Sequence, residues 1–230
     1  MLMTATLTST ENTWRHQAVA ALVSGGPDSA ILVAELARDS PRVVPIYVRF
    51  GMIWEDEEED ALRHFLRALA APAMAPLKVF QLPIASVYGP HWSLTGNQVP
   101  GADSPDAAVF LPGRNLLLLA QASVWCHLQQ IDTIAMGLLK GNPFADSSDA
   151  FFAGVEATVK AALGSKLHIV RPYRDLTKNQ VLQRGRSLPL GLTWSCMQPV
   201  RGIHCGRCNK CAERQKAFAD AGIHDPTRYA

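Results

Sequence analysis

The hydrophobic positions of the chain fall into short apolar blocks, separated by segments with helical spacing or turn residues. The apolar blocks show little polar alternation, which is typical of strands buried on both faces of a parallel sheet. This pattern predicts strands at 18–23, 42–50, 77–84 and 131–139, and a further extended piece at 167–173. Helices are expected to begin near residues 30 and 115, and to span 55–70 and 177–188. Thr177 is a suitable cap for the last of them.

The order of these elements predicts the fold class. Strands that alternate with helices favour a parallel sheet with helices on both faces, a Rossmann-like α/β fold. Ligands of such sheets bind beyond the carboxyl ends of the strands. Residues 85–108 are rich in Gly, Pro, Ser and Asn, and we expect them to form a long loop. Loops of this length in compact domains are often functional.

Composition and charge narrow the classes of protein. A chain of 230 residues with 48% hydrophobic residues can build a sizeable core, as one domain or one domain with an appendage. The net charge of +2 gives no support to nucleic-acid binding by bulk electrostatics. No apolar stretch reaches the roughly 18 residues of a membrane span. Because residues 1–17 also lack the apolar segment of a secretory signal, we expect a cytoplasmic protein with a flexible N-terminal tail.

A break in the apolar pattern marks the first candidate site. The run Ser24-Gly25-Gly26-Pro27-Asp28-Ser29 separates the first predicted strand from the first predicted helix. Two glycines let the backbone turn sharply, and proline is tolerated in the first turn of a helix. Several N–H groups would then converge at a helix N-terminus, where the dipole favours an anion. We interpret the loop as an anion site; a tight turn with an Asp or Ser cap is the alternative.

Four of the five cysteines form a second candidate site. Cys196, Cys205, Cys208 and Cys211 stand in the spacing C-x₈-C-x₂-C-x₂-C. Thiolates at C-x₂-C spacing can face one tetrahedral ion, so the cluster predicts a closed, structural Zn²⁺ site. An iron–sulfur cluster is the chemical rival, and disulfides are disfavoured without signs of export. The acidic run at 54–60 is interpreted as the solvated first turn of a helix, with a metal role as the alternative.

Together these motifs resemble a known family. The S-G-G-P-D-S run is similar to the S-G-G-x-D-S loop of the PP-loop ATP pyrophosphatases, which cut ATP between the α and β phosphates. With the downstream cysteines, it resembles the 7-cyano-7-deazaguanine synthase family. The segments that carry this resemblance are P-G-R-N at 112–115, R-P-Y-R-D-L-T-K-N-Q-V at 171–181, T-W-S-C at 193–196 and the C-terminal stretch from 205 to 230.

The resemblance implies an ATP-dependent ligase in an adenine nucleotide alpha hydrolase-like fold. Such an enzyme adenylates 7-carboxy-7-deazaguanine, traps the acyl-adenylate with ammonia, and activates the amide again to give the nitrile. ATP would be bound by the loop residues Ser24, Gly25, Gly26, Pro27, Asp28 and Ser29. Asp28 would also associate with Mg²⁺, and Arg114 and Lys178 would neutralise phosphate charge. The implied organisation is a tail (1–17), a nucleotide-binding domain (18–140) and a substrate-side and zinc region (141–230).

Two stretches depart from the family pattern. Y-V-R-F-G-M-I-W-E-D-E-E-E-D at 47–60 stands where the family has a segment like D-Y-G-Q-R-H, and 137–154 lacks a counterpart of Y-P-D-C-R-x-x-F. In the second stretch, Phe144, Asp146 and Asp149 are our candidates for binding a flat heterocycle by its face and its edge. A solvated loop with Ser and Asp helix caps is the alternative.

The departures leave more than one function open. A PP-loop ligase or amidase acting on a different carboxylate fits the same motifs. A tRNA-modifying PP-loop enzyme is weakened by the modest net charge, and a non-enzymatic nucleotide-binding module has little use for Arg114 and Lys178. The expected partners are a small carboxylate and ammonia, with a homodimer possible through an apolar helix face.

Overall fold

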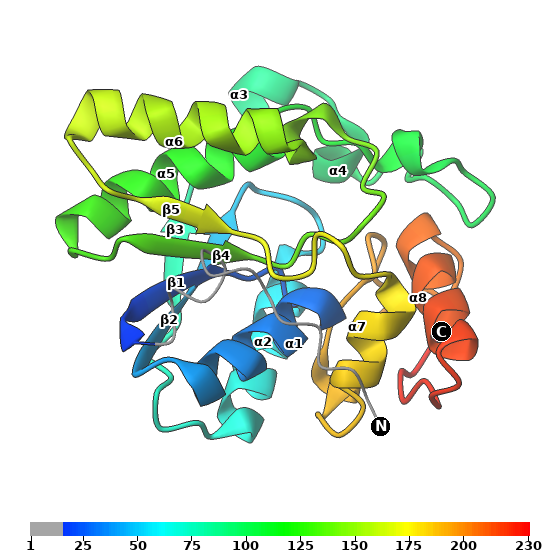
Figure 1. Cartoon of the computed structure of the whole chain (residues 1–230). Helices are drawn as coiled ribbons and strands as arrows, with labels where there is room; N and C mark the ends of the chain where they lie inside the picture. Colours follow the sequence, from blue (N-terminus) through cyan, green and yellow to red (C-terminus); the bar gives the residue numbers. More distant parts are fainter. Residues whose placement is uncertain (1–15) are drawn as a thin grey trace.

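The described part of the chain, residues 16–230 of a computed structural model, is built around one five-stranded sheet (Figure 1). All neighbouring strands are parallel, in the order β3-β2-β1-β4-β5. The strands are β1 (Ala18–Leu22), β2 (Arg42–Arg49), β3 (Lys78–Gln81), β4 (Thr133–Met136) and β5 (His168–Val170). The predicted tail at 1–17 lies outside the described residues except for its last two.

Helices cover both faces of the sheet. Figure 1 shows α5 and α6 on one face, and α1, α2 and α7 on the other. The helices are α1 (Pro27–Asp39), α2 (Glu55–Leu69), α3 (Ala85–Tyr88), α4 (Trp92–Thr95), α5 (Arg114–Leu128), α6 (Asp149–Leu163), α7 (Lys178–Arg184) and α8 (Asn209–Asp220). Short 3-10 helices lie at Asp106–Val109, Ala145–Ser147 and Leu190–Leu192. The predicted Rossmann-like α/β class is confirmed.

Strand β1 shows why the first apolar block has no polar alternation. Ala20 and Leu22 belong to the core cluster that contains residues of α5 and α6. Val19 and Ala21 belong to the cluster on the other face, with residues of α1 and α7. Because successive strand side chains point to opposite faces, a strand covered on both sides must be apolar throughout.

The strand order creates a crevice beside β1. The chain runs from β1 outward to β2 and β3, and then crosses back to β4 on the other side of β1. Ligands bind at such a switch point, beyond the carboxyl ends of the strands. The loops that follow β1 and β4 meet there: a Cβ added at Gly137 would lie 3.3 Å from the backbone carbonyl of Asp28.

Two segments differ from the sequence-based expectation. Residues 85–108, predicted as a loop, contain the short helices α3 and α4. Helix α6 begins in a stretch that was predicted as a substrate site, with a solvated loop and helix caps as the alternative. Ser148 caps α6 by accepting a hydrogen bond from the Phe151 N–H, and the buried residues Phe152, Val155 and Val159 recur at helical spacing. This pattern was present in the sequence, but its Ser and Asp residues were assigned to a loop.

The second half of the chain joins the same sheet. Strand β5 pairs with β4, and α6 and α7 lie over opposite faces of the sheet (Figure 1). The predicted boundary between 140 and 141 therefore falls between two paired strands. The division into two functional regions stays a prediction.

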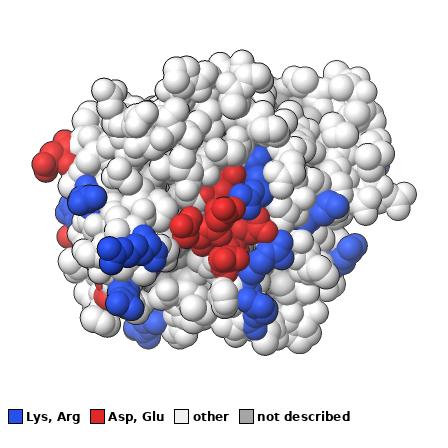
Figure 2. Space-filling model, turned by 180° about the vertical axis from the view of Figure 1, so that it is seen from behind, with Lys and Arg blue, Asp and Glu red and all other residues white. Residues whose placement is uncertain are grey.

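The surface has two notable features. On α5, Leu116, Val124 and Leu128 are exposed large hydrophobic residues at spacings of eight and four; the predicted homodimer stays a prediction. Figure 2 shows acidic side chains gathered at the centre of the face opposite to that of Figure 1, flanked by Lys and Arg. Among the described helices, none is both long enough and apolar enough to cross a membrane.

Candidate active site

The loop at 24–29 joins β1 to α1 and is held in one shape by its serines. The Ser29 hydroxyl accepts a hydrogen bond from the Ser24 N–H at 3.2 Å and donates one to the Gly26 carbonyl at 3.1 Å. Helix α1 begins at Pro27, and no side chain caps its N-terminus. The unused N–H groups of the first turn and the helix dipole therefore suit a phosphate group.

Gly25 is required by both its conformation and its surroundings. Its φ is +73°, a region that favours glycine. A Cβ there would lie 2.9 Å from the backbone oxygen of Glu58 and 3.0 Å from its Cγ. The first turns of α2 are thus packed directly against the loop.

A cavity of about 290 Å³ lies at this switch point; we call it the main cavity. Polar groups on its wall include Ser24, Asp28, Glu58, Arg114, Asp146 and Lys178. Aromatic and other apolar groups on its wall include Trp54, Trp92, Phe110, Phe144, Trp194 and Met197. A smaller cavity of about 120 Å³ shares Ser24, Gly26, Asp28 and Arg114 with it and reaches Tyr47 of β2. Asp28 and Arg114 therefore stand where the two cavities meet.

Asp28 and Lys178 form an ion pair across the main cavity. Lys178 Nζ lies 2.6 Å from Asp28 Oδ2 and 3.6 Å from Glu213 Oε1. Burial opposes the charged form of Lys178, but Asp28 and Glu213 outweigh it and raise the pKa of the ammonium. Thr177 and Gln180 form a capping box that fixes the start of α7, so the predicted cap is confirmed.

Two atoms at this place are buried and have no hydrogen-bond partner. They are Asp28 Oδ1 and Arg114 Nε. An unpartnered carboxylate oxygen beside the loop at 24–29 is a donor of the hard type that Mg²⁺ prefers. An unpartnered guanidinium N–H suits an anionic oxygen. The donor set therefore fits the Mg²⁺ and the phosphate that the sequence predicted.

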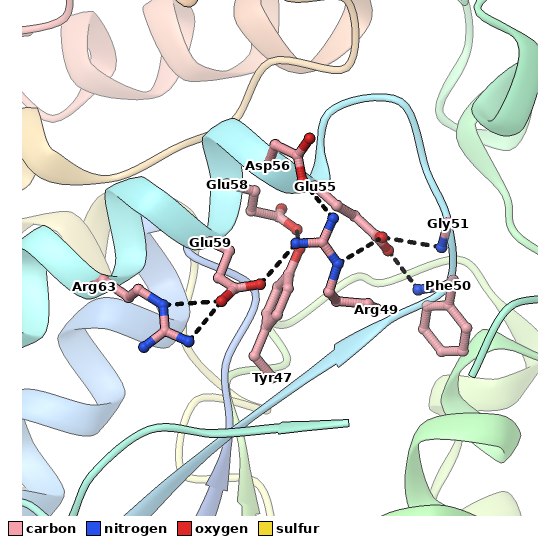
Figure 3. Close-up of polar contacts among 9 residues, drawn as sticks. All are labelled: Tyr47, Arg49, Phe50, Gly51, Glu55, Asp56, Glu58, Glu59 and Arg63. Carbon is pink, nitrogen blue, oxygen red and sulfur yellow. Dashed lines mark hydrogen bonds and ion pairs between the residues drawn. The ribbon is translucent and has the colours of Figure 1, made fainter. Parts of the chain in front are cut away.

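Glu58 is a wall residue that sequence reasoning missed. Its Oε2 accepts a hydrogen bond of 2.6 Å from the Tyr47 hydroxyl (Figure 3). Burial raises the pKa of Glu58 to about 7, against the lowering effects of Tyr47 and Arg114. The signal was in the helical spacing, because positions 55, 58, 62 and 65 share one face and Leu62 and Phe65 are buried core residues.

The other carboxylates of this acidic run have structural partners. Glu55 accepts hydrogen bonds from the N–H groups of Phe50 and Gly51, and so fixes the turn after β2 (Figure 3). Arg49 pairs with Asp56 at 2.5 Å and with Glu59 at 2.8 Å. The run is thus only partly the solvated helix turn that the sequence suggested.

The three predicted substrate residues are not all brought together. Phe144 stacks on Phe110 with ring centroids 4.8 Å apart, and Asp146 Oδ2 accepts a hydrogen bond from the Asn115 N–H at 3.1 Å. Both Phe144 and Asp146 line the main cavity. Asp149 lies on a different cavity, where it pairs with Arg171 at 2.7 Å. Because Asp149 begins α6 and its carboxylate is taken by Arg171, its placement gives no support to a role beside Phe144.

The cysteine cluster has the geometry of a metal site. The sulfur atoms of Cys196, Cys205, Cys208 and Cys211 lie within 4.8 Å of one another, all are buried, and none forms a disulfide. Backbone N–H groups point at the sulfurs, including Cys205 N to Cys196 Sγ at 3.2 Å and Cys208 N to Cys205 Sγ at 3.3 Å. Four sulfur donors with such outer hydrogen bonds fit a closed Zn²⁺ site.

The cysteine cluster is tied to the cavity through α8. This helix begins directly after Cys208 and carries Lys210, Glu213 and Arg214, which all line the main cavity. Lys210 Nζ lies 2.5 Å from Glu213 Oε2. Arg214 is buried and donates to the Thr193 hydroxyl at 2.8 Å and to the Thr227 hydroxyl at 2.6 Å. Sequence reasoning missed these residues because nothing local shows that α8 faces the loop.

Comparisons with known proteins agree over nearly the whole chain. The family model described as queuosine biosynthesis protein QueC matches residues 17–222. The curated 7-cyano-7-deazaguanine synthase 1 of Sphingopyxis alaskensis is 33% identical over 228 residues, which is 92% of this chain and 98% of the relative. The 7-cyano-7-deazaguanine synthase of Xylella fastidiosa strain M12 is 32% identical over 220 residues, covering 90% of this chain and 93% of the relative.

Among solved structures, an NMN synthetase from Francisella tularensis matches with a TM-score of 0.42 and 16% identity. The match covers 90% of this chain and 78% of that one.

Proposed function

Because the chain belongs to the queuosine biosynthesis protein QueC family, we propose that it is a 7-cyano-7-deazaguanine synthase. The reaction joins 7-carboxy-7-deazaguanine to ammonia through an acyl-adenylate, which gives the amide and releases AMP. A second ATP-dependent activation then removes the amide oxygen and leaves the nitrile. The observation that carries the ATP-dependent part is the uncapped N-terminus of α1, with the buried free oxygen of Asp28 in its first turn. A carboxylate needs such activation because it is a poor electrophile.

The loop at 24–29 would hold the pyrophosphate end of ATP. Its N–H groups and the dipole of α1 attract the phosphates, and Lys178 and Arg114 add positive charge. Asp28 Oδ1 would hold Mg²⁺, which screens phosphate charge when bound. Since Asp28 and Arg114 stand between the two cavities, the α phosphate and the attacking carboxylate can meet there.

The apolar wall of the main cavity would hold the deazapurine ring. Phe110 and Phe144 offer a stacked pair of aromatic rings, and Trp54 and Trp92 offer a second pair with centroids 5.8 Å apart. Asp146 lies on the same cavity and can accept N–H donors of a guanine-like edge. The carboxylate of the substrate would then point towards Arg114.

The cysteine site would have a structural part in this reaction. Zn²⁺ bound by four buried thiolates has no open position for substrate, so its contribution is to folding. By fixing Cys208 and Cys211, it would hold α8 so that Glu213, which is paired with Lys210, reaches Lys178 at the phosphate end of the cavity.

A ligase acting on another carboxylate is the second candidate. This candidate is favoured by the stretch that replaces D-Y-G-Q-R-H. The arginine of this stretch, Arg49, is paired with Asp56 and Glu59 and is therefore occupied within the protein. That stretch also contributes Trp54 and Glu58 to the main cavity. If the acid substrate differed from that of the family, the residues of the cavity wall would differ while the phosphate loop would stay the same.

One experiment decides between the two candidates. Purified protein is incubated with ATP, Mg²⁺ and ammonium chloride, with and without 7-carboxy-7-deazaguanine, and AMP and product mass are measured. The proposed function requires acid-dependent AMP and a nitrile product. If other aromatic acids give AMP while the deazapurine acid gives none, the second candidate replaces the first.

A further inference from the structure

Glu58 lies on the wall of the main cavity, and the proposed phosphate site does not use its carboxyl group. Its carboxylate accepts a hydrogen bond of 2.6 Å from the Tyr47 hydroxyl (Figure 3). Glu58 Cγ and the Glu58 carbonyl pack against Gly25. It therefore lies beside the loop that is proposed to hold ATP, at a position set by β2 and by the start of α2.

The charges around Glu58 come from several elements. Tyr47 of β2 donates to it, and Arg114 of α5 favours its charged form. Glu55, on its own helix, opposes that form, as does burial. Asp28 and Lys178 face the same cavity but are paired with each other. At neutral pH the group can thus both accept and release a proton.

The other acids on the main cavity are held by lysines or by the start of a helix. Asp28 is paired with Lys178, and Glu213 with Lys178 and Lys210. Asp146 accepts the Asn115 N–H at the start of α5. Glu58 is held by a neutral hydroxyl and forms no ion pair at hydrogen-bond distance with the described residues, and burial outweighs the lowering effect of Tyr47 on its pKa.

We propose that Glu58 is the general base that removes a proton from the nitrogen nucleophile. This inference rests on the proposed function and concerns its second step. The lone pair of ammonia forms the C–N bond at the carbonyl carbon of the acyl-adenylate. Nitrogen gives one proton to the Glu58 carboxylate, the C–O bond to phosphate breaks, and its electron pair leaves with AMP. The amide is then neutral, and Glu58 returns its proton to solvent. Tyr47 is a positioning residue that orients the base.

The test separates the two steps of the reaction. Adenylation is followed as pyrophosphate release from ATP and 7-carboxy-7-deazaguanine without ammonium, and amide formation as product mass after ammonium is added. Glu58→Gln keeps the shape and the Tyr47 hydrogen bond but cannot take a proton. We expect it to slow amide formation by about 100-fold or more and pyrophosphate release by only a few fold. Glu57→Gln is the matched control, since Glu57 is the preceding residue of α2 and does not line the main cavity.

The dependence of amide formation on pH separates a proton-transfer role of Glu58 from a packing role, because a residue that only packs would leave it unchanged. At constant free ammonia, amide formation should fall on the acid side as Glu58 is protonated. Tyr47→Phe removes a hydrogen bond that lowers the pKa of Glu58, so this acid limb should move to higher pH. The measurement is repeated with hydroxylamine in place of ammonia. Hydroxylamine is a weaker base than ammonia, so it is largely unprotonated at neutral pH.

The outcomes are distinguishable. If Glu58→Gln slows both steps equally, or forms amide at the wild-type rate, Glu58 is not the base and the proposed function survives. An acid limb that stays in place in Tyr47→Phe also overturns the assignment. If the wild-type protein releases no pyrophosphate with the deazapurine acid, the proposed function fails, and the inference fails with it.

Discussion

The main cavity has two halves that are built in different ways. The phosphate half consists of a six-residue loop, an uncapped helix end and the Asp28–Lys178 pair. The ring half consists of side chains such as Trp54, Trp92 and Phe144, which come from segments far apart in the chain. The phosphate half depends on backbone geometry, and different sequences adopt this geometry only when they carry the same short motif. The ring half depends on side-chain identity, which can change without altering the fold.

The two stretches that depart from the family pattern both reach the ring half. Trp54 comes from the first stretch, and Phe144 and Asp146 from the second. Glu58, also from the first stretch, lies at the border with the phosphate half. The retained motifs supply the loop, Arg114 and Lys178 instead. Under the proposed function, the residues that would bind the phosphates match the family pattern, whereas most of those that would bind the acid substrate lie in the two stretches that depart from it.

The largest effect is expected in the phosphate half. Asp28→Asn keeps the size of the side chain but removes the charge that pairs with Lys178 and would hold Mg²⁺. We expect AMP release to fall by about 10³-fold, in the range seen when one stabilising group of a transition state is lost. Asp39→Asn, at the exposed end of the same helix, is the control and should keep the wild-type rate. If Asp28→Asn releases AMP at the wild-type rate, Asp28 has no role in binding phosphate or Mg²⁺.

The second effect concerns the cysteine site, which lies at the start of α8. Cys208→Ser should abolish the zinc content of about one ion per chain and lower the free energy of unfolding by several kcal/mol. For a domain of this size the midpoint of thermal unfolding would fall by on the order of 10 °C. The measurements are metal analysis and thermal unfolding.

Cys126→Ala is the matched control for the cysteine site. It also removes a buried thiol, but one in α5, outside the cysteine cluster, so the zinc content should be unchanged. Equal metal content in the two variants would show that the cluster is not the zinc site, and iron in place of zinc would favour the rival cluster.

A smaller and more selective effect is expected in the ring half. Asp146→Asn should raise the KM for the acid about 10- to 100-fold, the range for losing a hydrogen bond to a charged group. The KM for ATP should change far less. Asp149→Asn serves as the comparison, because Asp149 is exposed and faces Arg171 on another cavity. A similar loss for both substrates in Asp146→Asn would place Asp146 in the phosphate half.

The same contrast explains what the sequence could predict. The strand blocks, the loop at 24–29 and the cysteine spacing are local patterns, and the structure has the sheet and the clustered thiols that they predicted. The encounter of Lys178 with Asp28 spans 150 residues and was available only through resemblance. Glu58 and Lys210 depend on how α2 and α8 dock, which is a tertiary property. The position of Asp149 at the start of α6, paired with Arg171, depends on a helix that the sequence analysis did not predict.

The smallest effect concerns stability at the border of the two halves. The pKa of Glu58 is about 7 in the folded protein and near the ordinary value of about 4.3 in the unfolded chain. The folded state therefore holds the proton more tightly, so charging Glu58 destabilises the fold as the pH rises from about 4 to about 7. Glu58→Gln removes that cost and should raise the free energy of unfolding by about 1–2 kcal/mol at pH 8, with no gain near pH 4.

Urea unfolding of both proteins at the two pH values measures the difference, with Glu57→Gln as a control that should show none. A gain of equal size at both pH values would mean that burial does not raise the pKa of Glu58, and would contradict its proposed exchange of a proton at neutral pH.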